Sequence, residues 1–152
     1  MKLARLTLLA ALCALASPVF AQETPKVAGV WQSQSGITRV KVSPCGTGLC
    51  AHVVWQKNPS KDVHNPEPEK RERPIVGLQL VSNMKPAAPG EWTGAIYNYE
   101  DGKTYHGKVK AVSANAIEIG GCEVRGMIFQ SRTWTKVNLR MSRESYVNAG
   151  NL

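Results

Sequence analysis

The sequence predicts an all-β fold, a small antiparallel barrel or sandwich. Three observations support this prediction. Several short stretches alternate apolar and polar residues, as a strand with one wet face requires. Turn-forming residues separate these stretches at short and regular intervals. No internal stretch keeps a helical period. The chain therefore favours a sheet that folds back on itself over any helical architecture.

Residues 1–21 are typical of a secretory signal peptide. Lys2 and Arg5 give a positive start, Leu6 to Ala16 is almost entirely apolar, and Val19-Phe20-Ala21 carries the residues that signal peptidase reads. The apolar run is shorter than the roughly 20 residues that a membrane-spanning helix needs. We therefore expect cleavage after Ala21, no membrane span, and a periplasmic or secreted mature chain.

The mature chain has the length of a single domain. We expect an N-terminal arm over residues 22–28, one barrel domain over 29–139 and a polar tail over 140–152. The leader takes two of the 19 Lys and Arg residues with it, which leaves 17 against 11 acidic residues and a formal net charge of +6. This balance is typical of a basic periplasmic protein, and it favours anionic surfaces or ligands as partners.

The strands can be placed in order. Thr38 to Val42 alternates strictly, and Ala51 to Trp55 sets Ala51, Val53 and Trp55 on one face. Asp101-Gly102 is a strong hairpin signal between two β-rich stretches. The predicted strands are a first one that opens on Gly29-Val30-Trp31, followed by 38–42, 51–55, 91–99, 103–111, 116–119 and 131–139, with turns at 100–103 and 113–115.

Three cysteines remain after the leader. In an oxidising compartment Cys45 and Cys50 are expected to form a disulfide across the turn Gly46-Thr47-Gly48. Their spacing also fits half of a zinc knuckle, but no second pair of ligands completes it. Cys122 is left over, either buried as a small apolar residue or free to react.

Residues 57–77, the charged loop, interrupt the strand pattern. Four prolines and many charges exclude a central strand there. Pro66 to Arg71 is compatible with one short helical turn, with proline at its start. Long loops of this kind are often functional. The charged loop is either a solvated connection or a lid over a ligand.

Five motifs in order carry a family resemblance. They are Gly29-Val30-Trp31; Pro44-Cys45-Gly46-Thr47-Gly48-Leu49-Cys50; Asp62, Asn65-Pro66, Arg71, Arg73-Pro74 and Gly77-Leu78 in the charged loop; the turn Glu100-Asp101-Gly102-Lys103-Thr104-Tyr105; and Thr133-Trp134-Thr135. Over most of the mature chain they resemble the exported bacterial family called domain of unknown function 2147. That resemblance implies a lipocalin-like β-barrel, although a fold alone does not assign a ligand.

The resemblance also implies details. By analogy with lipocalins, Trp31 would close the floor of the barrel under a basic side chain from a late strand, such as Arg140. The family usually has arginine after Thr-Trp-Thr, whereas this chain has Lys136, which weakens any planar stacking on a tryptophan. A second family cysteine is replaced near Phe129, so Cys122 is expected to be unpaired.

Residue patterns argue against most catalytic and metal chemistry. His52, His64 and His106 lack the spacing of metal ligands, and no Gly-x-Ser-x-Gly or phosphate loop is present. Nucleic-acid binding would suit a basic barrel with aromatic residues, but export removes the chain from those targets. We therefore expect no enzyme activity, no metal, no cofactor and no nucleic-acid partner.

Two functions remain. The first is a binding module for a small apolar or amphipathic molecule, with aromatic walls and an arginine anchor; its expected site residues are Trp31, Trp92, Tyr97, Tyr105, Arg71 and Arg73. Trp92 and Tyr97 would share the inner face only with a bulge, for instance at Gly94.

The second is an envelope protein that uses its charged loop and basic surface to bind a protein or polyanion. Small inward residues such as Ala51, Gly94 and Gly107 leave room for a ligand or serve strand curvature. Either form is expected to be a monomer or a weak dimer.

Overall fold

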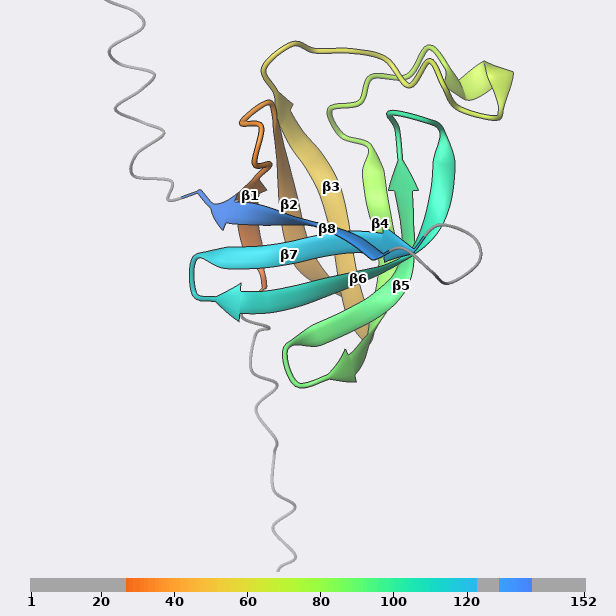
Figure 1. Ribbon diagram of the computed structural model, residues 1–152. Coiled ribbons are helices and arrows are strands. Elements are labelled where there is room, and N and C mark those ends of the chain that lie inside the picture. Colours follow the sequence, from red (N-terminus) through yellow and green to blue (C-terminus); the bar gives the residue numbers. More distant parts are fainter. Residues whose placement is uncertain (1–26, 123–128, 138–152) are drawn as a thin grey trace, which may run out of the picture.

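A computed structural model describes residues 27–122 and 129–137 of the chain. These residues form a closed barrel of eight antiparallel strands, shown in Figure 1. The strands are β1 (Gly29–Gln32), β2 (Thr38–Cys45), β3 (Gly48–Gln56), β4 (Gln79–Ala88), β5 (Glu91–Asn98), β6 (Lys103–Ser113), β7 (Ala116–Cys122) and β8 (Phe129–Lys136). One 3₁₀ turn, η1 (Pro68–Lys70), lies in the charged loop.

The barrel is a simple meander in which each strand pairs with the next one along the chain. The pairs Trp31↔Lys136 and Gln32↔Thr135 join β1 to β8 and close it. Closure removes the exposed strand edges that an open sheet would present. The predicted all-β antiparallel barrel and the short helical turn in the charged loop are therefore confirmed.

One strand, β4, was not predicted from the sequence. No strand was expected in 79–88, where β4 lies. In β4 the buried residues are Val81 and Met84, three positions apart rather than two. Asn83 between them has a φ of 53°, and the β4–β5 register shifts between Val81 and Lys85. This irregularity erases the period of two by which strands are recognised.

The last strand also differs from its predicted bounds. β8 begins at Phe129 and ends at Lys136, whereas the prediction ran from 131 to 139. Val137 is already outside β8, although its N–H still donates to the carbonyl of Val30 at 2.8 Å. The predicted cation Arg140 and the polar tail 140–152 lie outside the described residues.

A packed floor fills one part of the barrel. Trp31, Met84 and Ile117 are fully buried there. The indole N–H of Trp31 donates to the carbonyl of Val27 at 2.8 Å, and Lys136 Nζ lies 5.4 Å from the centroid of the Trp31 ring. A cation in this position attracts the face of an indole. The described cation over Trp31 is thus Lys136.

Two inward glycines serve packing. A Cβ on Gly107 would lie 2.2 Å from Ile96 Cδ1, and one on Gly94 would lie 3.1 Å from the Cα of Met84. Their missing side chains therefore admit the side chains of Ile96 and Met84. The register of β5 with β6 runs without a break from Glu91 to Asn98, so this pairing has no bulge at Gly94.

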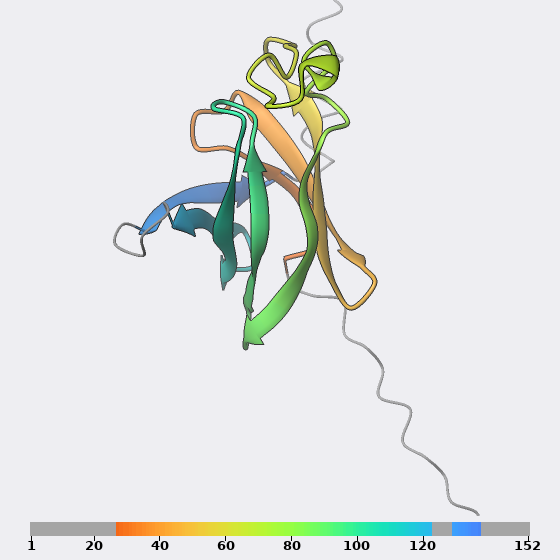
Figure 2. The same ribbon diagram turned by 90° about the vertical axis from the view of Figure 1, so that its right-hand side faces the viewer.

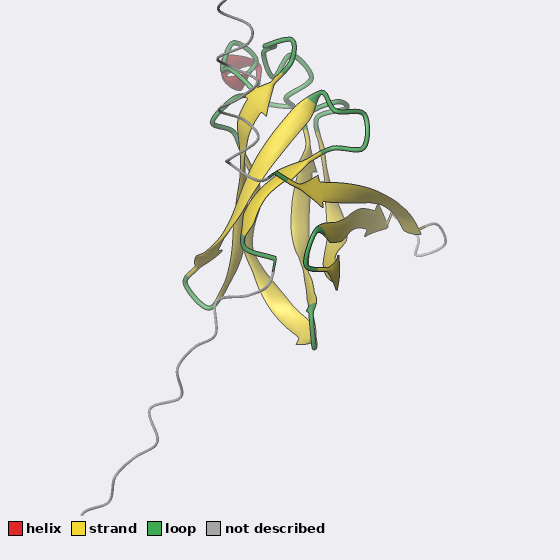
Figure 3. Cartoon of the chain, turned by 90° about the vertical axis from the view of Figure 1, so that its left-hand side faces the viewer, coloured by secondary structure: helices red, strands yellow, loops and turns green. Residues whose placement is uncertain are grey.

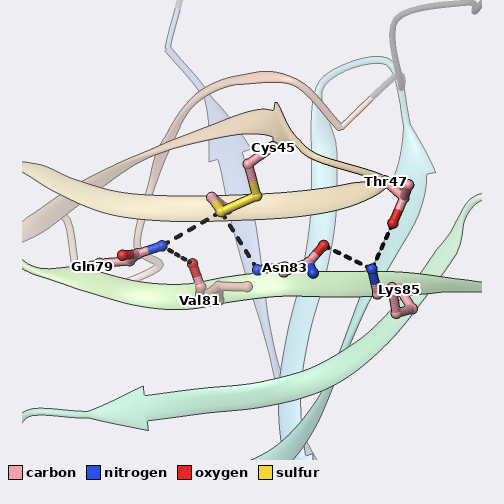
Figure 4. The surroundings of a disulfide bond; sticks show 7 residues. Cys45, Thr47, Gln79, Val81, Asn83 and Lys85 are labelled. Atoms are coloured by element: carbon pink, nitrogen blue, oxygen red, sulfur yellow. Dashed lines mark hydrogen bonds between the residues drawn. A yellow bond between two sulfur atoms is a disulfide. The ribbon is translucent and has the colours of Figure 1, made fainter.

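The predicted disulfide between Cys45 and Cys50 is present in the β2–β3 hairpin. Figure 4 shows how this hairpin contacts β4. The Cys50 sulfur accepts from the side chain of Gln79 at 3.4 Å and from the backbone N–H of Asn83 at 3.5 Å. Lys85 Nζ donates to the Thr47 hydroxyl at 2.6 Å. The disulfide therefore supports the irregular part of β4.

Replacing both Cys45 and Cys50 by alanine should lower the free energy of unfolding by about 2 kcal/mol, because the cross-link restricts the unfolded chain over only a short loop. Urea denaturation of the double variant measures this. Reduced wild-type protein is the control and should behave like the variant. Equal stability of oxidised and reduced protein would contradict the prediction.

Candidate ligand cavity

An open cavity occupies the barrel above the packed floor, with a volume of about 510 Å³. The β1–β2 turn, the β5–β6 turn and the charged loop gather at the mouth. Figure 2 shows these segments at one end of the barrel, while the β2–β3 and β4–β5 turns lie at the other. The mouth is thus built from connections and the floor from strands.

The cavity walls are mainly apolar. Val40, Ala51, Val81 and Ile96 contribute from four neighbouring strands. Ile119 of β7 and Trp134 of β8 complete the wall. The remaining lining residues are Ser33, Gln34, Ser35, Ile37, Thr38, Leu80, Tyr97, Asn98, Tyr99, Glu100 and Arg132. The cavity thus has an apolar body and a rim rich in polar groups, as small-molecule sites usually do.

The charged loop is fixed by a buried carboxylate. Asp62 is fully buried, and its Oδ2 accepts from Arg73 Nε at 2.9 Å and from Arg73 Nη2 at 2.7 Å. The amide of Asn65 donates to the same oxygen at 2.7 Å. Tyr97 donates its hydroxyl to Asp62 Oδ1 at 2.7 Å. A buried carboxylate needs this many partners, because its desolvation is costly.

This network ties the charged loop to the cavity. Tyr97 lines the cavity, yet its hydroxyl bonds to Asp62 in the loop. The Arg73 guanidinium also lies 5.9 Å from the centroid of the Tyr97 ring. Arg71 Nε donates to the carbonyl of Asn65 at 2.8 Å, which stabilises the turn around η1. Figure 3 shows the helical turn and its loop at the end of the barrel.

The same hydrogen bonds help to determine the protonation states of Asp62 and Tyr97. Burial alone would raise the pKa of Asp62, but hydrogen bonds from Tyr97, Asn65 and Arg73, together with the Arg73 charge, lower this pKa below 3.8. Burial, followed by the hydrogen bond and charge of Asp62, raises the pKa of Tyr97 above 10.0. At neutral pH the pair is therefore a carboxylate and a neutral phenol.

The structure separates the six residues expected to bind a ligand. Tyr97 lines the cavity, whereas Trp31 is buried in the floor. Trp92 packs against the core without reaching the cavity. Arg71 and Arg73 bond within the charged loop and do not line the cavity.

The β5–β6 turn residues form a local cluster instead. Tyr105 donates its hydroxyl to Asp101, and the backbone N–H of Lys103 donates to Asp101 Oδ1 at 3.0 Å. A Cβ on Gly102, whose φ is 72°, would lie 1.8 Å from the carbonyl oxygen of His64. The β5–β6 turn therefore packs closely against the charged loop, and this is why position 102 requires glycine.

Most residues on the cavity wall were missed as candidates, and two of them lie on the last strand. Arg132 and Trp134 stand two apart on β8, and both line the cavity. Their partners across the ladder are Ile119 and Ile117. Alternation along β8 was the available signal, but it does not tell which face is the inner one.

The sequence of the chain matches one protein family. The model of the family described as "Uncharacterized protein conserved in bacteria (DUF2147)" matches residues 29–136. The chain belongs to this family. The family resemblance expected from the sequence is therefore confirmed, but the family itself carries no assigned function.

A solved structure shares the fold. It is described as "Protein HP1028 from the human pathogen Helicobacter pylori belongs to the lipocalin family". The TM-score is 0.68 at 22% sequence identity, over 77% of this chain and 86% of that protein. No curated protein matches the chain. The similarity establishes a lipocalin-like barrel.

Two other features are absent from the described residues. Within residues 27–122 and 129–137, no group of three His, Cys, Asp or Glu side chains is placed to hold a metal ion. The same residues contain no helix that is long and apolar enough to cross a membrane.

Asp62→Asn should lower the free energy of unfolding by about 3 kcal/mol. Breaking a buried ion pair costs roughly 3–5 kcal/mol, and Arg73 is partly exposed, which places the cost at the low end. Glu72→Gln is the matched control, since it breaks the exposed Lys61–Glu72 pair in the same loop and should have little effect. Urea denaturation compares them, and equal losses would refute the assigned role of Asp62.

The Asp62 contribution should depend on pH. Because its folded-state pKa is lowered, its stabilisation is complete above the unfolded-state value of about 3.8 and disappears as the pH falls through the lower folded value. The stability difference between wild type and Asp62→Asn should therefore shrink between about pH 5 and about pH 2. Denaturation midpoints across this range measure it. A difference that stays constant argues against an ionised Asp62.

Proposed function

We propose that this protein is an exported, non-enzymatic binding protein that holds a small apolar or amphipathic molecule inside its barrel. The observation that carries the proposal is the open cavity of about 510 Å³. Its volume falls in the range of about 300–1,000 Å³ typical of small-molecule pockets. A barrel of eight strands can either fill with side chains or hold one small ligand.

The wall chemistry supports a ligand with substantial apolar surface. Ala51, Ile96 and Ile119 offer aliphatic contacts, and Trp134 offers an aromatic one. Burial of apolar ligand surface against such side chains is favourable by about 25 cal/mol per Å². Polar rim residues such as Gln34 and Asn98 suit a polar group that stays near water.

The expected site residues take different parts in this proposal. Tyr97 contacts the ligand, since it lies on the wall. Trp31 supports the floor on which the ligand rests, and Arg71 and Arg73 position the charged loop beside the mouth. Trp92 and Tyr105 act through the packing of β5 and β6. Catalytic, metal and cofactor chemistry have no part in it.

Compartment and assembly belong to the same proposal. The signal-like segment 1–21 and the Cys45–Cys50 disulfide support a periplasmic or secreted protein. A closed barrel with an internal site needs no second chain, which supports a monomer or a weak dimer.

A neutral fluorescent probe, N-phenyl-1-naphthylamine, tests the proposal. Its emission should rise in the presence of the mature protein, because the naphthyl ring leaves water for the cavity. Ala51→Phe should weaken binding by about tenfold or more, since Ala51 is on the wall and 5% exposed, and the larger side chain fills ligand space.

Ala95→Phe is the matched control. Ala95 is exposed on β5 and does not line the cavity, so this variant should bind like wild type. Both variants are first checked for a cooperative thermal transition. Failure of the folded wild type to bind the probe would overturn the proposal and favour the second candidate, in which the exposed charged loop meets an envelope protein or a polyanion.

A further inference from the structure

We infer that the ligand is an amphipathic anion with one negative charge, whose head group is bound by Arg132 and whose apolar part fills the cavity. This inference rests on the proposed function and specifies its ligand class. The observation behind it is a solvent-exposed arginine on the wall of a mainly apolar cavity, with no partner among the described residues.

Arg132 belongs to the inner face of β8. It pairs with Ile119, which also lines the cavity, and it stands two residues before Trp134 on the same face. Trp134 in turn pairs with the fully buried Ile117. Arg132 is therefore one step farther from the packed floor than Trp134. An apolar tail that runs toward Trp134 would leave its head group at Arg132.

Arg132 has no partner among the residues that the structure describes. It donates no hydrogen bond and forms no ion pair with any side chain described in 27–122 or 129–137. The other arginines in these ranges are engaged. Arg39 bonds to Gln32 and lies 4.6 Å from the ring centroid of Trp55, and the two arginines of the charged loop bond to its carboxylate and carbonyl groups.

The guanidinium selects the head group. Its planar fork of donors matches a carboxylate or a related anion, and a charge-assisted hydrogen bond is stronger near apolar surroundings. A cationic head would be repelled. A neutral head would gain only ordinary hydrogen bonds.

The number of charges is limited by the rest of the cavity. Among its described lining residues, Arg132 is the one cation, and neither lysine nor histidine is present. Glu100 at the β5–β6 turn adds a negative charge to the rim. A head group with several negative charges would meet one cation and a like charge. The cavity therefore favours a single charge and an apolar tail.

Three probes with the same tail test the inference: decanoate, 1-decanol and decyltrimethylammonium. Each is titrated against N-phenyl-1-naphthylamine bound to the mature protein at neutral pH. Decanoate should displace the probe with an affinity at least about tenfold higher than that of decanol, the ratio expected for one charge-assisted hydrogen bond. Decyltrimethylammonium should bind most weakly.

Variants then assign the preference to one side chain. Arg132→Gln should lower the affinity for decanoate by about tenfold while leaving decanol affinity unchanged, and Arg132→Lys should restore part of the preference. Lys57→Gln is the control: it removes one positive charge from an exposed residue of the charged loop that does not line the cavity, and it should preserve decanoate binding. Since Arg132 has no described partner, its variants should keep the wild-type melting temperature.

The outcomes separate the two proposals. Equal binding of decanoate and decanol, or a decanoate preference that survives Arg132→Gln, overturns the inference and leaves the binding function in place. Tighter binding of decyltrimethylammonium also overturns it. A folded protein that binds neither the naphthylamine nor any decyl probe overturns the binding function together with the inference.

Discussion

Closure of the sheet is the constraint on which the rest of the structure depends. Trp31↔Lys136 and Gln32↔Thr135 are the pairs that join β1 to β8. At the same place the Lys136 ammonium lies against the Trp31 ring, and the indole bonds to the carbonyl of Val27. A cavity with walls on all sides exists only because the sheet closes there. The floor and the strand junction are therefore one structural unit.

The charged loop adds a second, independent constraint at the other end. Asp62 holds the loop through side chains of the loop itself and through Tyr97 of β5, a wall residue of the cavity. Loop geometry and cavity shape are thus coupled through one phenol. The apolar walls of the cavity, such as Ala51 and Ile119, lie between these two ends.

The sequence predicted much of the fold because alternation and turn chemistry act locally. Thr38 to Val42 and the Asp101-Gly102 turn carry their structure in adjacent residues, and the spacing of Cys45 and Cys50 was enough to predict the disulfide. β4 was missed because Asn83, with its positive φ, breaks the alternation between Val81 and Met84.

The site was harder to predict. Asp62 and Tyr97 are 35 residues apart, and only tertiary structure brings them together. Arg132 was missed because a barrel strand with polar residues on both faces gives no sign of which one lies inside.

Native mass spectrometry of the mature protein, purified gently and without added ligand, tests most directly whether the cavity is a binding site. We predict a discrete extra mass on the folded protein that disappears when the same sample is denatured. The released molecule should be a small amphipath. A folded protein with only the mass of its own chain, before and after denaturation, would contradict the account.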